Sequence, residues 1–181
     1  MIILFGAAGS GKSVQGQKLS EKYGWRWMSV GQMLRECADE SMKEIMLTGG
    51  LVDDNFVVKM MHDAMEEELN AGRNGILDGY PRNQWQAHWI VENGDDRFID
   101  GAIILDVDHE ELRKRLNSRG RADDTDEAIQ RRWALFDSTI SEMGELLMTR
   151  GVKIARVNGK GSIDEVTERI ENKLRDWKVI E

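Results

Sequence analysis

The chain has 181 residues, of which 40% are hydrophobic and 32% charged, so it can form one compact soluble domain with a substantial core. The net charge of −8 argues against a general nucleic-acid-binding surface, because nucleic acid is held mainly by neutralising its phosphates. A single cysteine, Cys37, excludes an intramolecular disulfide and favours a reducing compartment.

The apolar runs and the helical stripes alternate along the chain. No run reaches membrane-spanning length, and the first apolar run is too short for a signal sequence, so we expect a cytoplasmic protein that meets neither membrane nor nucleic acid. Strands are predicted at Met1–Phe5, Trp25–Met28, Gly75–Leu77, Ala102–Leu105 and Val152–Ala155. Helices are predicted at Lys12–Tyr23, Asp54–Asn70 and Glu127–Met148, with a last helical stripe from Ile163 to Trp177 that starts after Ser162. The alternation predicts an α/β fold with a five-stranded parallel sheet covered by helices on both faces.

A glycine-rich segment directly follows the first strand. Gly6–Ser13 reads GAAGSGKS and fits the pattern G-x-x-x-x-G-K-S/T between a strand and a helix. Its glycines let backbone N–H groups approach phosphate oxygens, Lys12 supplies a positive charge, and Ser13 can ligand Mg²⁺. The alternative, a tight turn that binds nothing, fits this pattern poorly. The segment predicts a nucleoside triphosphate site of unspecified class.

Two later segments place charges near that site. Asp78 follows the third predicted strand, where a carboxylate can hold the hydration shell of Mg²⁺, and Arg82 comes four residues later in the turn that holds the only proline. Arg119, Arg121, Arg131 and Arg132 are close in sequence, which is unfavourable unless anions neutralise them. A solvated charged face remains the alternative for this run.

Six segments in chain order resemble the adenylate kinase (nucleoside monophosphate kinase) family over essentially the whole chain. They are GAAGSGKS, MSVGQMLR (28–35), GGLVDD (49–54), DGYPRNQWQA (78–87), RGRADD (119–124) and VNGKGSIDEV (157–166). The resemblance implies reversible phosphoryl transfer from ATP to AMP, with Mg²⁺, by a protein with the P-loop fold. The sequence has no cysteine cluster and so no zinc-type lid, and its apolar stripes are used up by one sheet, which favours a monomer. The resemblance also implies a monophosphate-binding insert near residues 29–58, a very short lid at 119–127 and a cis Tyr80–Pro81 bond.

The resemblance further assigns roles to individual residues. The ATP site would consist of Gly9, Ser10, Gly11, Lys12, Ser13, Val14, Arg119 and Gly161. The monophosphate site would consist of Val30, Arg35, Gly50, Leu51, Val52, Gly79, Arg82, Gln86, Arg121 and Arg132. Lys12, Arg82, Arg119, Arg121 and Arg132 would stabilise the transferred phosphoryl group, and Ser13 and Asp78 would hold Mg²⁺, Asp78 through water.

The chain departs from the family pattern at several positions. Val14 and Val30 stand where hydroxyl residues are usual, Gln32 replaces an aspartate, and only Gly120 separates Arg119 from Arg121. These departures leave two alternatives open. One is the same chemistry on another acceptor, such as CMP, UMP or dAMP. The other is a nucleotide-binding module with little turnover.

Overall fold

The computed structural model describes residues 1–37, 39–93, 99–121 and 124–181. Its centre is the predicted five-stranded parallel sheet, whose strands lie in the order β2-β3-β1-β4-β5. The strands are β1 (Ile2–Phe5), β2 (Arg26–Ser29), β3 (Gly75–Asp78), β4 (Gly101–Asp106) and β5 (Lys153–Asn158). All five lie within one or two residues of the predicted runs at their starts, and β5 extends three residues further.

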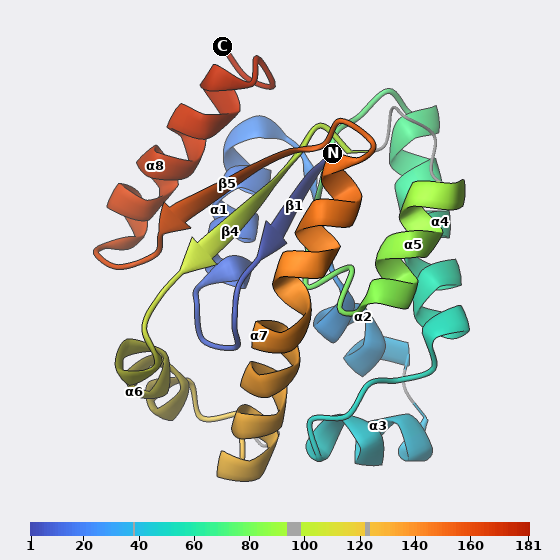
Figure 1. Ribbon diagram of the computed structural model, residues 1–181, viewed down its shortest axis with the longest axis vertical. Helices are drawn as coiled ribbons and strands as arrows, with labels where there is room; N and C mark the ends of the chain where they lie inside the picture. The colour runs from blue at the N-terminus through green and yellow to red at the C-terminus, as the bar shows by residue number, and fades with distance from the viewer. Residues whose placement is uncertain (38, 94–98, 122–123) are drawn as a thin grey trace.

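Helices cover both faces of the sheet (Figure 1). Strand β1 shows why, because it is buried along its whole length and alternates its side chains between two apolar clusters. Ile3 and Phe5 join a cluster with α4, α5 and α7, whereas Ile2 and Leu4 join one with α1 and α8. The bounds of these helices are α1 Lys12–Tyr23, α4 Asp54–Asn70, α5 Gln84–Asn93, α7 Asp126–Met148 and α8 Ile163–Asp176.

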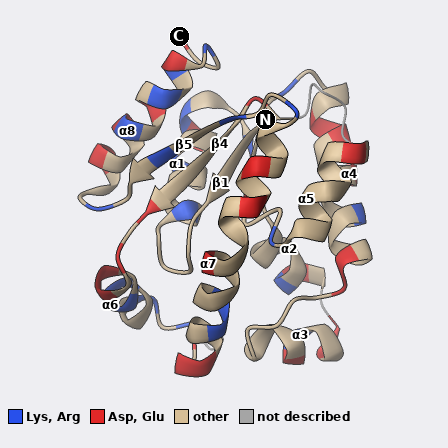
Figure 2. Ribbon diagram, in the orientation of Figure 1, with Lys and Arg blue, Asp and Glu red and all other residues tan. Residues whose placement is uncertain are grey.

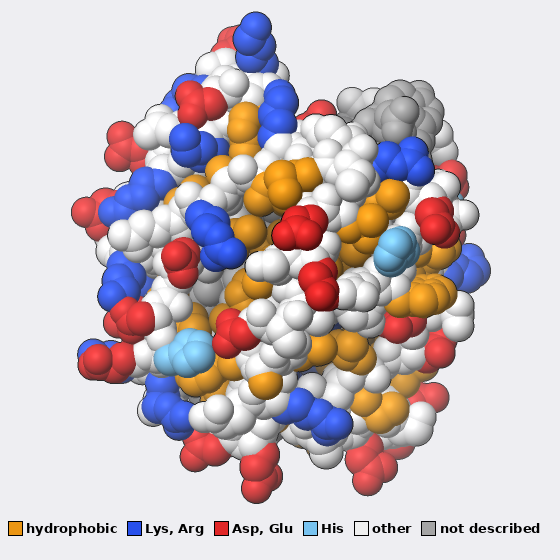
Figure 3. Space-filling view, in the orientation of Figure 1, with side chains coloured by type: hydrophobic (Ala, Val, Ile, Leu, Met, Phe, Trp, Pro, Cys, Tyr) orange, Lys and Arg blue, Asp and Glu red, His pale blue; other side chains and the backbone are white. Residues whose placement is uncertain are grey.

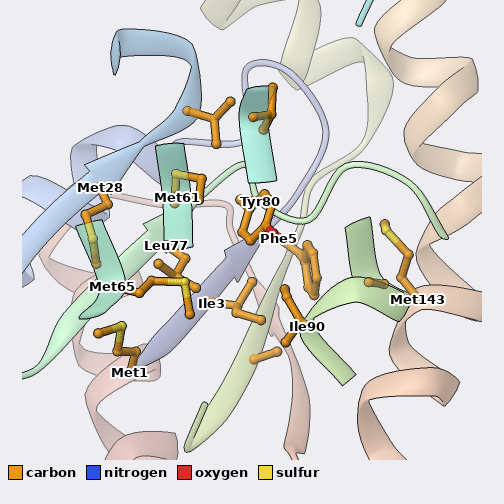
Figure 4. Packing of buried hydrophobic residues seen from close by; sticks show 14 of the residues in the cluster. Met1, Ile3, Phe5, Met28, Met61, Met65, Leu77, Tyr80, Ile90 and Met143 are labelled. Carbon is orange, nitrogen blue, oxygen red and sulfur yellow. The ribbon is translucent and has the colours of Figure 1, made fainter. Parts of the chain in front are cut away.

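Buried methionines fill much of the larger cluster (Figure 4). Met28, Met61, Met65 and Met143 each expose at most 3% of their surface. Flexible thioether side chains suit an irregular space between a sheet and three helices. Trp85, by contrast, is 45% exposed and does not belong to the core.

The helix ends carry local signals. Ser162, after which this helix was predicted to start, caps α8 and forms a reciprocal capping box with Glu165. Asp53 and Thr125 cap α4 and α7 by accepting from backbone N–H groups. The sequence did not predict α5. It also did not predict three further helices, α2 (Val30–Cys37), α3 (Glu40–Leu47) and α6 (His109–Arg119).

The segments assigned to substrate recognition lie beyond the carboxyl ends of the strands, with α2, α3 and α6 at this end (Figure 1). The predicted insert 29–58 contains the end of β2, all of α2 and α3, and the start of α4. Six residues, 120–125, connect α6 to α7 in the predicted lid. Ala122 and Asp123 of that lid lie outside the described residues. The insert and lid boundaries stay predictions.

No helix in the described part of the chain is both long and apolar enough to cross a membrane. Nor do the described residues place three or more histidine, cysteine, aspartate or glutamate side chains where they could hold a metal ion together.

Candidate active site

The phosphate loop runs between β1 and α1 and depends on its glycines. Gly9 has φ +91°, and an added Cβ would lie 2.9 Å from both the carbonyl of Leu112 and the side chain of Leu116 on α6. Gly11 caps α1 in the left-handed region and offers no side chain to the first N–H groups of the helix. These N–H groups and the positive end of the helix dipole therefore face an incoming anion.

Lys12 lies half-buried at the base of this loop. Its Nζ donates hydrogen bonds to the carbonyls of Gly6 and Ala7, the second over 3.1 Å. Burial lowers the pKa of Lys12 to about 8; Asp78 opposes this shift, whereas Arg82 and Arg119 add to it. A phosphate arriving here would favour the charged form of Lys12.

A carboxylate and a hydroxyl meet beside Lys12. The Oδ2 atom of Asp78, at the end of β3, accepts hydrogen bonds from Ser13 Oγ at 2.7 Å and from Trp27 Nε1 at 3.3 Å. Asp78 is only 3% exposed and keeps its position through these donors. Oxygen ligands of this kind are the ones that Mg²⁺ prefers, so the pair fits a hydrated magnesium ion.

Two arginines converge on the backbone at Gly31. A Cβ added at Gly31 would lie 3.4 Å from Nη1 of Arg35 and 3.5 Å from Nη2 of Arg82. The Nε atom of Arg82 donates to the carbonyl of Gly79 at 2.8 Å, and Gly79 adopts φ +73°. The turn after β3 thus aims one guanidinium at another that comes from α2, an arrangement suited to a shared anion.

Asp124 joins two further arginines. It accepts two hydrogen bonds from Arg119, at 2.8 and 2.6 Å, and one from Arg132 at 3.4 Å. Its side chain is only 4% exposed. Arg132 also donates to the carbonyl of Met46 at the end of α3, 3.0 Å away. Arg119 of α6 and Arg132 of α7 are therefore joined through one acid. Figure 2 shows basic positions on both helices at this end of the molecule.

Two cavities meet over the phosphate loop. Both are lined by Lys12, Ser13, Arg119 and Arg121. The first is also lined by Arg35, Gly50, Leu51, Asp78, Gly79, Arg82 and Arg132. The second has a volume of about 440 Å³, within the range of nucleotide-sized pockets, and is also lined by Gly9, Ser10, Gly11, Val14, Arg115 and Gly161. The geometry therefore offers two anion-binding compartments that share a junction at Lys12.

Comparison with known proteins agrees with this architecture. A sequence model of the adenylate kinase family matches residues 4–152. The chain is 37% identical over 186 residues to the adenylate kinase of Xanthomonas euvesicatoria pv. vesicatoria, covering 96% of this chain and 98% of that protein. It is 34% identical to the adenylate kinase of Maricaulis maris, over 97% and 98% of the two chains, and 30% identical to that of a Synechococcus species, over 96% and 97%.

The chain belongs to the adenylate kinase family. Membership identifies it as a nucleoside monophosphate kinase, an ATP-dependent phosphotransferase. The predicted cis bond at Tyr80–Pro81 is present. Of the eighteen family positions assigned to nucleotide binding from the sequence, fifteen line one or both cavities.

Three positions of the family pattern lie elsewhere. Val30 is fully buried and Val52 is 5% exposed, and both pack in the core. Gln86 is 1% exposed; its Oε1 accepts from the backbone N–H of Arg82 at 2.8 Å and its Nε2 donates to Asp54 at 2.7 Å. The structure places the Gln86 amide beneath the Arg82 turn, outside the cavity lining.

Sequence reasoning missed residues whose role depends on distant contacts. Arg115 lines the second cavity and donates to the carbonyls of Ser10 and Gly159, at 3.3 and 3.0 Å. It precedes Arg119 by one helical turn, and this spacing could have singled it out within the charged run. Asp124 stood within the RGRADD segment, but no sequence pattern paired it with both Arg119 and Arg132.

Proposed function

We propose that this kinase transfers a phosphoryl group reversibly between ATP and AMP, forming two molecules of ADP. The observation that carries the proposal is the ring of positive charge around one continuous pair of cavities. Lys12 lies at the junction, and the first cavity is lined by Arg35, Arg82, Arg119, Arg121 and Arg132. Six cations facing one space suit two polyphosphate ligands that meet end to end.

On the donor side, ATP would lie along the second cavity. The N–H groups of Gly9–Ser13 and the ammonium of Lys12 would hold its phosphates, with Arg119 above them. The backbone at Gly161 would contact the adenine, and Arg115 would lie between that backbone and the phosphate loop. Val14, which is 44% exposed and lines this cavity, would contribute only apolar contact.

On the acceptor side, the monophosphate would be held between Arg35 and Arg82. Gly50 and Leu51 would border its base, and Gly79 would let the backbone approach its phosphate. Val30 and Val52 would support this wall from the core. Gln86 would hydrogen-bond to the base only by giving up its own hydrogen bonds to Arg82 and Asp54.

Transfer would proceed by in-line positioning and charge stabilisation. Lys12, Arg82, Arg119, Arg121 and Arg132 would surround the oxygens of the transferred group, whose charge changes in the transition state. Ser13 and Asp78 would hold Mg²⁺, which when bound shields the phosphate charges. The acceptor attacks as an ionised phosphate oxygen, so no side chain needs to act as a general base.

We also propose that the protein works as a monomer in the cytoplasm, without nucleic acid or membrane partners. The net charge of −8 and the interspersed acidic and basic side chains in Figure 3 support the absence of nucleic-acid and membrane partners, because the face shown has no extended basic patch. Size-exclusion chromatography with light scattering tests the monomer.

An acceptor panel tests the reaction. Purified protein with Mg-ATP would receive AMP, CMP, UMP, GMP or dAMP, with one sample lacking acceptor, and diphosphate formation would be measured. We expect AMP to be the preferred acceptor. Preference for a pyrimidine nucleotide would retain the mechanism and reject AMP, an outcome that the buried Val30 motivates. Absence of transfer to any acceptor would favour a nucleotide-binding module.

A further inference from the structure

The carbonyl groups of the phosphate loop need donors of their own. A loop that turns its N–H groups toward an anion turns many of its carbonyls away from it. Lys12 donates to the carbonyls of Gly6 and Ala7, and Arg115 donates to that of Ser10. The carbonyl of Ala8 accepts from the indole Nε1 of Trp133 at 3.0 Å.

The hydrogen bond from Trp133 differs from the other three in charge. Lys12 and Arg115 are cations that line the cavities, so an arriving triphosphate competes with the carbonyls for them. The indole N–H is neutral and has no such competitor. The bond between Trp133 and Ala8 can therefore persist while phosphate is bound and while Lys12 changes partners.

Trp133 is held firmly enough to fix the loop. It is 4% exposed and packs in a small cluster with Ala7, Leu112, Leu116 and Ile129. Its ring stacks on His109 of α6, with centroids 4.6 Å apart and planes 18° apart. The indole thus joins the phosphate loop to both α6 and α7.

Trp133 directly follows Arg132 in α7. Successive helical residues point about 100° apart. Arg132 accordingly lines the first cavity while Trp133 faces the phosphate loop. Trp133, which supports the phosphate loop, is therefore bonded directly to Arg132, the arginine that we expect at the transferred phosphoryl group.

We propose that Trp133 is a positioning residue. Through its hydrogen bond to the carbonyl of Ala8, it fixes the position of the phosphate loop relative to Arg132. This inference rests on the proposed phosphoryl transfer. Loss of the indole donor would leave both substrates bound but would misalign the donor phosphates with the arginine. Such misalignment acts on the transition state more than on the ground state.

Substituting Trp133→Phe tests the proposal, because phenylalanine keeps an aromatic ring and removes the donor. We expect kcat to fall about fivefold or more, as for loss of one hydrogen bond, with the KM values for ATP and acceptor changed less than about twofold. The matched control is Trp89→Phe, in a residue of α5 that packs against His62, which should lower stability at most. An unchanged kcat in Trp133→Phe, or an increase in KM alone, would overturn the proposal.

A second experiment serves if Trp133→Phe does not fold. Replacing Trp133 by 3-benzothienylalanine keeps the bicyclic shape and substitutes sulfur for the N–H group. We expect the same fall in kcat, and full activity would overturn the proposal.

Indole hydrogen exchange in the wild-type protein, followed by NMR with and without Mg-ADP, gives an independent readout. The Trp133 proton should exchange slowly in both states, whereas that of the 45% exposed Trp85 should exchange quickly. Fast exchange at Trp133 would overturn the proposal. If the wild-type protein transferred phosphate to no acceptor, the proposed function would fail, and the exchange rates would still decide whether Trp133 holds the loop.

Discussion

Asp124 balances two arginines that would otherwise repel each other across the site. Its buried carboxylate accepts from Arg119 and Arg132, both of which remain partly exposed. Replacing Asp124→Asn removes the charge and turns one of the two accepting oxygens into an NH₂ donor that faces the guanidinium groups. We expect kcat to fall about tenfold, because both arginines lose their orientation. We expect the free energy of unfolding to fall by about 1–3 kcal/mol.

Steady-state kinetics and urea unfolding measure these two effects. The control is Asp126→Asn, whose carboxylate pairs with Arg113 at 2.8 Å but is 81% exposed, so that its loss should change little. Equal effects of the two substitutions would contradict the role given to Asp124.

Gly49 allows the end of the α3 segment to approach α7. It has φ +73°, and an added Cβ would lie 2.8 Å from the carbonyl of Ala128. Gly49→Ala should therefore destabilise the protein in two ways, through the strained backbone conformation and through the clash with Ala128. We expect the clash to lower the free energy of unfolding by about 1–3 kcal/mol in addition to the cost of the conformation. Gly72→Ala isolates that cost, because Gly72 has φ +67° and no atom within 4 Å of the added Cβ. Thermal unfolding of both variants compares the two effects, and equal losses would argue against a tight contact at Ala128.

Glu68, near the end of α4, connects this helix to β2 and to the turn before β3 at the amino end of the sheet. Its side chain is 2% exposed and accepts from Arg73, which follows α4, at 2.7 and 2.9 Å, and from Arg26 at the start of β2 at 3.1 Å. The hydrogen bonds from Arg73, followed by those from Arg26, lower the pKa of Glu68. The unfolded chain therefore binds a proton at Glu68 before the folded one does, and the stabilisation is present above the unfolded pKa and lost as pH falls through the folded pKa.

Glu68→Gln should accordingly be less stable than the wild-type protein at pH 7, and the gap should narrow below about pH 4.5. Urea unfolding at several pH values between 7 and 3.5 measures the gap. The neighbouring Glu67→Gln, 64% exposed, should show a small and nearly constant difference. A gap for Glu68→Gln that does not change with pH would refute the coupling.

At the scale of the elements, the predicted helices are those with long apolar stripes, together with α1, which was predicted from the glycine-rich segment before it. The stripes of α4 and α7 gave their bounds to within one residue, because each buries one face against the sheet. The helix α3 has no buried residue, and α6 buries only Leu112 and Leu116, so neither presents a periodic signal. Their helical state depends on caps at Asp39 and Asp108 and on tertiary contacts.

The candidate site likewise contains residues that the sequence predicted and residues that it did not. Local motifs predicted the phosphate loop, Asp78 and Arg82, because the strand ends bring consecutive residues to the ligand. Contacts between Trp133 and Ala8, or between Arg115 and Gly159, join residues 44 to 125 positions apart. No periodicity or spacing encodes such pairs, so only the folded chain reveals them. The burial of Gln86 and Val30 likewise follows from packing around the Arg82 turn.

For the molecule as a whole, we expect the connection between α6 and α7 to determine how well water is excluded from the two cavities. Residues 120–125 are all that lies between these helices, so little chain is available to cover the two cavities. Water that reaches the bound γ-phosphate competes with the acceptor, because the same charges that stabilise transfer also stabilise hydrolysis. We therefore expect measurable ATP hydrolysis without acceptor, and suppression of this hydrolysis when the acceptor fills its cavity.

Phosphate release from Mg-ATP, measured with and without AMP, gives the rate of hydrolysis in the absence and in the presence of the acceptor. Lys12→Met provides the background, since it should abolish both transfer and hydrolysis if the two share one site. Hydrolysis equal to that background would mean that the site excludes water despite the short connection. The arginines around Asp124 would then have to close the space that a longer lid covers.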